Sequence, residues 1–268
     1  MSGSWFHHPD LSVAVARRNA VDFLVDLILL YGEAGLSRGR SLMWSGCFPS
    51  NTAYYSALSR LKKAGVLDCG RTAQGQRYLR ANVPSRDAAA MNPLQGWNSR
   101  WDGRWRILTY DITEEEHAFR AGLRAHLQKL RMGCLQQSVW ITPRDIRPEY
   151  ADLQKVLGIG DVSFLFEAHT VLGQSSREIV QKAWDFERIR ADHHRYLDMV
   201  QAARKRLDGH PPPRSGLEAM AREEVWAYRA VMEKDPLLPR SLWPPDYTGF
   251  RAYEAHHAFV SRLRALLR

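Results

Sequence analysis

Residues 50–80 read SNTAYYSALSRLKKAGVLDCGRTAQGQRYLR and decide the fold expected for the N-terminal part of the chain. Ser50 is a favourable N-cap, Gly65 is a favourable helix end, and the apolar residues between them recur at helical spacing. The residues expected to face the core are Tyr54, Ala57, Leu58 and Leu61. Two short strands, 66–69 and 76–81, are expected around a turn that has glycine at both ends. The segment therefore predicts a helix followed directly by a β-hairpin.

The same segment is strongly basic, with six cationic side chains against one acid, Asp68. The cationic residues are Arg60, Lys62, Lys63, Arg71, Arg77 and Arg80. A helix with one apolar and one cationic polar face can enter the major groove of DNA, while a basic hairpin contacts neighbouring phosphates. With further helices expected at 13–31 and 41–46, the segment predicts a winged helix-turn-helix DNA reader. The alternative is an ordinary amphipathic helix whose basic face is solvated.

The predicted DNA contacts divide into two groups. Side chains in the first turns of a recognition helix point most directly at base edges. Here these residues are Asn51, Thr52, Tyr55 and Ser56. Cations at the end of the helix and on the hairpin are suited to phosphates, which contribute affinity and salt dependence but little sequence choice. These residues are Arg60, Lys62, Lys63, Arg71 and Arg77.

Composition supports a polyanionic partner. The 268 residues carry a formal net charge of +9, and residues 1–90 hold eleven Lys or Arg against six Asp or Glu. The three cysteines are an odd number at wide spacing, which indicates neither a disulfide framework nor a zinc cluster and fits a reducing cytoplasm. The longest apolar run, residues 23–31, is interrupted by Asp26 and is too short to span a bilayer. We expect a cytoplasmic protein with no membrane partner.

The middle of the chain predicts a second domain after a linker at 82–102. Thr113 with Glu116 forms a capping-box pattern that opens a helix with its apolar stripe at helical spacing. Strands are expected at 104–112, 134–136, 137–142 and 162–171, with a second helix at 149–157. Strand, helix, paired strands, helix and strand is the order of a ferredoxin-like sandwich.

The remaining residues predict a helical domain. Two further capping-box patterns, Ser175 with Glu178 and Ser215 with Glu218, indicate where helices begin. The expected helices cover 176–207, 217–234 and 250–267, and a proline-rich segment at 235–247 is expected to brace the last two. The predicted fold class is therefore α+β, with a winged helix-turn-helix, a ferredoxin-like domain and a helical C-terminal domain.

Three segments together resemble the PaaX family of bacterial transcriptional repressors, which control phenylacetate degradation. The first is the basic helix and hairpin, the second is Trp101-Asp-Gly-Arg-Trp105, and the third is Asp235-Pro-Leu-Leu-Pro239 followed by Trp243-Pro and Asp246-Tyr-Thr-Gly249. The resemblance implies an N-terminal winged helix domain at 1–90, a ferredoxin-like dimerisation domain at 91–174 and a helical C-terminal domain at 175–268. It also implies that an aryl-coenzyme A thioester, typically phenylacetyl-CoA, relieves repression.

A second resemblance bears on Asp111. The segments Ile107-Leu-Thr-Tyr-Asp111-Ile and Gln136-Gln-Ser-Val-Trp140 are similar to strands of the small CRISPR adaptation protein, in which an aspartate ending the first strand can bind a divalent metal. One carboxylate per subunit is a poor magnesium site, so the main interpretation of Asp111 is a polar strand end. The alternative is a metal-dependent nuclease.

Other sequence patterns provide no support for an enzyme or a cofactor. The adjacent histidine pairs do not show the spacing of a helical zinc site, and a phosphate-binding loop or nucleophile motif is not apparent. Arginine and tryptophan residues around 184–229 fit helix packing as well as ligand binding, so the sequence assigns no effector pocket. The resemblance to the PaaX family leads us to expect a homodimeric repressor that binds double-stranded operator DNA of an aromatic-acid catabolic operon and is released by an aryl-CoA. A nonspecific architectural DNA binder is a third possibility.

Overall fold

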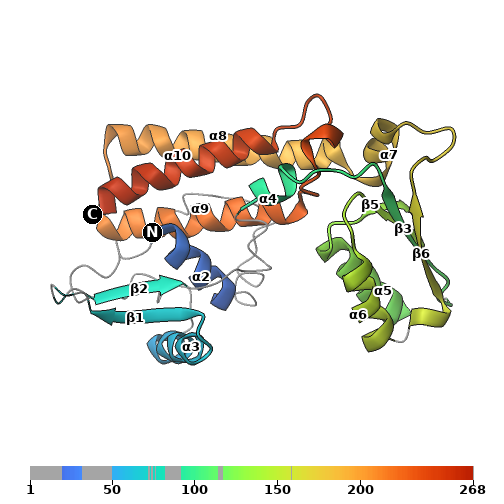
Figure 1. Ribbon diagram of the computed structural model, residues 1–268. Coiled ribbons are helices and arrows are strands. Elements are labelled where there is room, and N and C mark those ends of the chain that lie inside the picture. The colour runs from blue at the N-terminus through green and yellow to red at the C-terminus, as the bar shows by residue number, and fades with distance from the viewer. Residues whose placement is uncertain are drawn as a thin grey trace. The chain divides into compact units, whose positions relative to one another are not determined.

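The computed structural model describes residues 20–31, 50–71, 73, 75, 77–81, 92–113, 117–157 and 159–267 (Figure 1). The chain divides into two compact units. The first is drawn from Met1–Met91, Asp192–Met232 and Thr248–Arg268, and the second from Asn92–Ala191 and Glu233–Tyr247. Helices and a four-stranded antiparallel sheet together make the fold a mixed α+β fold, as predicted.

The second unit contains the four-stranded sheet. Its strands are β3 (Trp105–Tyr110), β4 (Gly133–Gln136), β5 (Val139–Thr142) and β6 (Ser163–Ala168). They lie in the order β4-β5-β3-β6, and every pair is antiparallel. Helix α5 (His117–Lys129) connects β3 to β4, and α6 (Arg147–Leu157) with the short η5 (Ile159–Asp161) connects β5 to β6. This topology agrees with the ferredoxin-like order expected from the sequence.

Both faces of the sheet contribute to a core. On one face, Leu123 and Leu127 of α5 and Leu153 of α6 pack with Leu108 and Trp140. Figure 1 shows these two helices side by side against the sheet. On the other face, α7 (Ser176–Ala183) covers the β4 side through a cluster that includes Trp105, Ile141, Ile179, Val180 and Trp184.

The prediction of a single helix at 176–207 is wrong. It is divided into α7 and α8 (Phe186–Gly209), because Trp184 is extended, with φ −125° and ψ 137°. The Trp184 indole Nε1 donates to the Arg131 carbonyl at 3.3 Å, and Asp185 Oδ1 accepts from the Arg188 backbone N–H at 3.0 Å to begin the new helix. A long-range contact therefore ends one helix and a local cap starts the next.

Two smaller expectations also need correction. The described part of the predicted linker contains the short helix α4 (Leu94–Trp97), in which Trp97 is fully buried against Trp243 and Tyr247. Helix α9 begins at Arg214 rather than at 217, because the Pro213 carbonyl accepts from the Leu217 N–H. Glu218 consequently binds Arg214 at 3.2 Å within the first turns, and the predicted capping box with Ser215 does not start the helix. The box at Ser175 and Glu178 forms as predicted.

The first unit joins N-terminal elements to three C-terminal helices. Its described N-terminal elements are α2 (Ala20–Tyr31), α3 (Asn51–Lys63), β1 (Leu67–Arg71) and β2 (Arg77–Ala81). The C-terminal part of α8, most of α9 (Arg214–Lys234) and all of α10 (Gly249–Leu267) belong to this unit. Their buried residues include Tyr196, Val200, Tyr228 and Phe259. The helix predicted at 41–46, residues 13–19 and the Thr113–Glu116 capping box lie partly or wholly outside the described residues.

Candidate DNA-reading surface

Helix α3 begins where the sequence predicted. Ser50 has an extended backbone, and its Oγ accepts a hydrogen bond from the Ala53 N–H at 3.2 Å. At the other end, Gly65 has a φ of +72°, a conformation that glycine adopts without strain. The cap and the glycine give the helix fixed ends, so the positions of its side chains follow from the helical period.

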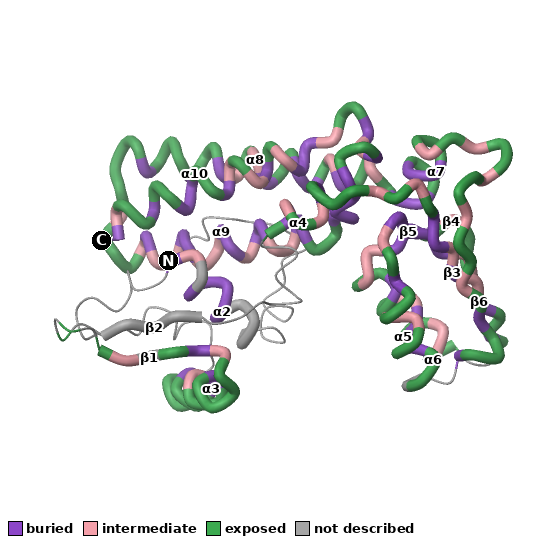
Figure 2. Tube along the Cα trace, viewed as in Figure 1, coloured by how far each residue is buried: buried purple, intermediate pink, exposed green. Residues whose placement is uncertain are grey.

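The two faces of α3 are separated as predicted. Tyr54 and Ala57 are each 1% exposed and Leu61 is 9% exposed, while Leu58 is intermediate. The four predicted base-reading residues, Asn51, Thr52, Tyr55 and Ser56, are all exposed. Tyr55 is 55% exposed, which is unusual for a large aromatic side chain. Figure 2 shows much of α3 as exposed. A large exposed aromatic ring beside three small polar side chains is available for contact with a partner.

The predicted phosphate contacts are partly described. Arg60, Lys62 and Lys63 are exposed in the last turn of α3. Cations at that end also interact favourably with the helix dipole, so a structural role and a phosphate-binding role are compatible. The basic end of α3 therefore does not by itself require a nucleic-acid partner.

The hairpin supplies further cations. Strands β1 and β2 pair antiparallel with Arg71 in register with Arg77, and Asp68 with Arg80. The exposed Arg71 donates from Nη1 to the Gly75 carbonyl at 3.1 Å, which holds its guanidinium at the turn. Arg71 therefore lies beside the turn of the hairpin, at the exposed end of β1. The side chain of Arg77 lies outside the described residues.

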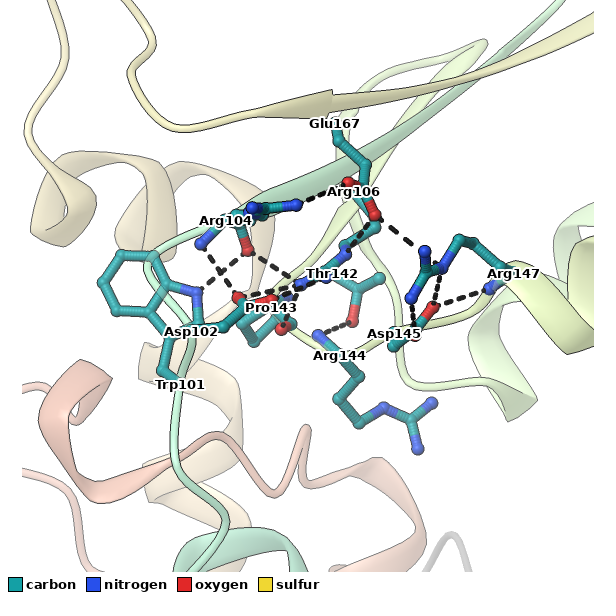
Figure 3. A network of polar contacts seen from close by, with 10 residues as sticks. All are labelled: Trp101, Asp102, Arg104, Arg106, Thr142, Pro143, Arg144, Asp145, Arg147 and Glu167. Carbon is teal, nitrogen blue, oxygen red and sulfur yellow. Dashed lines mark hydrogen bonds and ion pairs between the residues drawn. The ribbon is translucent and has the colours of Figure 1, made fainter.

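The tryptophan-flanked motif at 101–105 forms a structural network in the second unit (Figure 3). The side chain of Arg106 is only 4% exposed and donates to both oxygens of Asp102, at 2.6 and 2.9 Å. It also donates to Glu167 of β6 at 3.2 Å. The hydrogen bond from Arg106 lowers the pKa of Asp102, and Asp102 in turn raises the pKa of Arg106. The charges of Arg106, Asp102 and Glu167 compensate one another and hold the start of β3 in place. The motif at 101–105 therefore has a structural explanation that needs no catalytic role.

Arg147 and Asp145 extend this network at the start of α6. Arg147 donates to both Asp145 oxygens, at 2.6 and 2.9 Å, and lies 3.9 Å from Glu167. The hydrogen bonds from Arg147 lower the pKa of Asp145 to about 2. The carboxylate is therefore held ionised, as expected for a structural ion pair.

Asp111 lies exposed just beyond β3, where its backbone N–H donates to the Val162 carbonyl at 2.8 Å. Among the described residues, no group of three or more His, Cys, Asp and Glu side chains is placed to hold a metal ion. In the described part of the chain, Asp111 is therefore an exposed polar residue that follows β3.

Sequence reasoning missed a buried polar cluster in the first unit. Glu224 of α9 and His256 of α10 are both fully buried, with His256 Nδ1 2.7 Å from Glu224 Oε1. The Tyr196 hydroxyl donates to the same oxygen at 2.5 Å, and the Tyr228 ring stacks on the His256 ring at 3.8 Å. A second polar contact joins Asp26 of α2 to Arg229 of α9. In the sequence, these buried polar contacts are indicated only by single charged residues within otherwise apolar helix faces.

Comparison with known proteins gives three findings. Residues 98–180 match the family described as "PaaX protein central Cas2-like domain", and residues 184–267 match "PaaX-like protein C-terminal domain". The chain is similar to "Transcriptional repressor PaaX" of Escherichia coli (strain K12), at 26% identity over 244 residues, which is 83% of this chain and 74% of that protein. It is also similar to the structure of "Uncharacterized protein Rv0674 from Mycobacterium tuberculosis", at 20% identity and a TM-score of 0.49, with 84% of this chain and 88% of the other covered.

Within the described residues, no helix combines the length and the apolar character needed to cross a membrane.

Proposed function

Because the chain belongs to the PaaX family of transcriptional repressors, we propose that it represses transcription by reading operator DNA with helix α3 and hairpin β1–β2. Family membership makes the protein a regulator and not an enzyme, so the nuclease alternative is not favoured. The observation that carries the proposal is the exposed face of α3, where polar residues and Tyr55 precede three cations.

If the first turns of α3 contact bases and the hairpin contacts phosphates, variants of the two regions should affect DNA binding differently. Asn51→Ala removes a base-edge contact, so it should reduce the preference for operator over scrambled DNA by about 1–3 kcal/mol. Arg71→Ala removes a phosphate contact, so it should weaken binding to both DNAs equally and reduce the slope of log affinity against log salt by about 1. Arg251→Ala, which removes an exposed arginine of α10, is the matched control and should change neither quantity.

Fluorescence anisotropy at several salt concentrations measures both effects. An unchanged salt slope in Arg71→Ala would remove the hairpin from the DNA-binding surface. An unchanged preference in Asn51→Ala, Thr52→Ala, Tyr55→Ala and Ser56→Ala would remove the first turns of α3 from base recognition.

We also propose that the protein acts as a homodimer whose second copy covers β6. This strand is at one edge of the sheet, and Phe164 and Phe166 on it are 62% and 52% exposed, with ring centroids 6.2 Å apart. Exposed aromatic pairs on an edge strand favour association. Phe166 is in register with Ile107, so the pair lies on the sheet face opposite α5 and α6.

The oligomeric state tests this interface. Phe164→Ser with Phe166→Ser should convert a dimer to a monomer in sedimentation experiments, because the apolar area that the second copy buries is lost. Leu172→Ser, which changes an apolar residue that is 92% exposed outside the strand, is the control. A dimer that persists in the double variant would place the interface elsewhere.

The effector is proposed to be an aryl-coenzyme A thioester, and the regulated genes to be those of an aromatic-acid catabolic operon. Such a ligand releases the repressor only if it binds the DNA-free geometry more tightly than the DNA-bound one. Titration of a repressor–operator complex with phenylacetyl-CoA should lower the anisotropy, whereas coenzyme A alone should not. Equal effects of the two ligands would exclude the aryl group from recognition.

A further inference from the structure

Helix α2 is buried on more than one side. Five consecutive residues, Leu24 to Ile28, are all at most 8% exposed. An amphipathic surface helix buries residues only at every third or fourth position, so a run of five requires neighbours around the helix. Figure 2 shows this buried segment of α2, in contrast with the largely exposed α3.

The neighbours of α2 come from two parts of the sequence. Strand β2 of the hairpin packs along α2, and β1 of the same hairpin packs against α3. Helix α10 also contacts α2. Helix α2 therefore lies between the proposed reading elements and the C-terminal helices of the same compact unit.

An ion pair fixes this position. Arg229 Nη1 of α9 lies 2.5 Å from Asp26 Oδ2 of α2, and the two side chains are only 12% and 7% exposed. Removing two charges from water is unfavourable, and apolar residues of similar volume would often provide equal or greater stability. A buried pair at this place is better explained by the geometry it imposes than by the stability it adds.

The last residue of α2 lies within the electrostatic influence of the buried polar cluster. Tyr31 is 1% exposed, and its pKa is raised by burial first and by the carboxylate of Glu224 second. Glu224 is itself held by Tyr196 of α8 and His256 of α10. Tyr31 thus ends α2 close to a carboxylate on which three C-terminal helices converge.

We propose that Asp26 and Arg229 are positioning residues for DNA recognition, which hold α2, and through it the hairpin and α3, at one fixed orientation on helices α8–α10. This inference rests on the proposed function, because it assigns to the ion pair a role in reading DNA. A change in the C-terminal helices reaches the reading surface through this pair. Neither residue contacts DNA in this account.

The test replaces the pair by apolar residues. The double variant Asp26→Leu/Arg229→Met removes both charges of the pair together and should fold with a thermal midpoint close to that of the wild type. Its preference for operator over scrambled DNA should fall at least about tenfold, because α3 loses its fixed orientation, while its salt slope should not change because the phosphate-binding cations are intact. The matched control Asp208→Leu/Arg262→Met removes an exposed ion pair between α8 and α10 and should retain the preference.

Two results would overturn the inference. A folded double variant with the wild-type operator preference would leave the pair with a packing role only. If the double variant does not fold, Asp26→Asn/Arg229→Gln takes its place, because it also removes both charges but keeps polar side chains of similar size. The same loss of operator preference is expected, and a wild-type preference would again contradict the inference.

Hydrogen exchange gives a readout that does not depend on DNA. Amides of α3 and the hairpin should exchange faster in the double variant, and unchanged exchange there would contradict the inference. If wild-type protein showed no operator preference but the variant showed faster exchange, the proposed function would fail while the positioning role would stand.

Discussion

Replacing Glu224 by alanine is expected to destabilise the first unit more than any exposed charge replacement on the same helix. The carboxylate accepts from Tyr196 at 2.5 Å and lies 2.7 Å from His256 Nδ1, and both glutamate and histidine are fully buried. Hydrogen bonds to a charged group contribute about 1.5–3 kcal/mol each. Removing the carboxylate leaves the Tyr196 hydroxyl and the His256 ring nitrogen buried without their partner, at about 1–3 kcal/mol each, so a loss of about 3–5 kcal/mol is expected.

That loss is large compared with the stability of a typical folded protein, about 5–15 kcal/mol. It corresponds to a decrease in thermal midpoint of roughly 10 °C. Urea unfolding followed by circular dichroism measures the change in free energy, and hydrogen exchange assigns it to α8, α9 and α10.

Glu218→Ala is the matched control on α9. Glu218 binds Arg214 at 3.2 Å, but its side chain is 20% exposed and that of Arg214 is 48% exposed. An i, i+4 pair of this kind contributes about 0.3–0.5 kcal/mol. If Glu224→Ala unfolded at the same urea concentration as Glu218→Ala, the reasoning that ties the cluster to the helix packing would be refuted.

Three further predictions concern other parts of the chain. Gly133→Ala places a Cβ 2.6 Å from the Ala183 Cβ and 2.7 Å from the Trp184 ring, so overpacking should lower the unfolding free energy by about 1–3 kcal/mol in urea titrations. Ser50→Ala removes the N-cap of α3 and should cost about 1 kcal/mol, with faster exchange of the Ala53 amide, whereas Ser50→Asp should retain the cap. The pKa of Asp145 is lowered from 3.8 to about 2, so its carboxylate stabilises the folded state above pH 3.8, and this contribution is lost as the pH falls towards 2. The stability difference between Asp145→Asn and the wild type should therefore shrink across that pH interval in acid-unfolding curves.

Much of the local structure could be predicted because it depends on neighbouring residues. The cap at Ser50, the helical spacing of Tyr54, Ala57 and Leu61, and the capping box at Ser175 all follow from short-range patterns. The order of strands in the second unit followed from alternating strand and helix signals.

The features that could not be predicted depend on contacts between distant residues. The break at Trp184 arises because its indole packs on Gly133, and nothing in the helical period of residues 176–207 indicates it. Likewise, Asp26 could be interpreted from the sequence only as a charge that interrupts an apolar run. Its partner Arg229 is 203 positions away, so the ion pair becomes visible only in the folded chain.

The most direct test of operator recognition is fluorescence anisotropy of wild-type protein with promoter DNA and with a scrambled sequence at physiological salt. A sequence-specific repressor should bind its promoter about 10³-fold or more tightly than the scrambled DNA. Equal affinity for the two DNAs would contradict sequence-specific repression and would indicate a protein that recognises only the phosphate backbone.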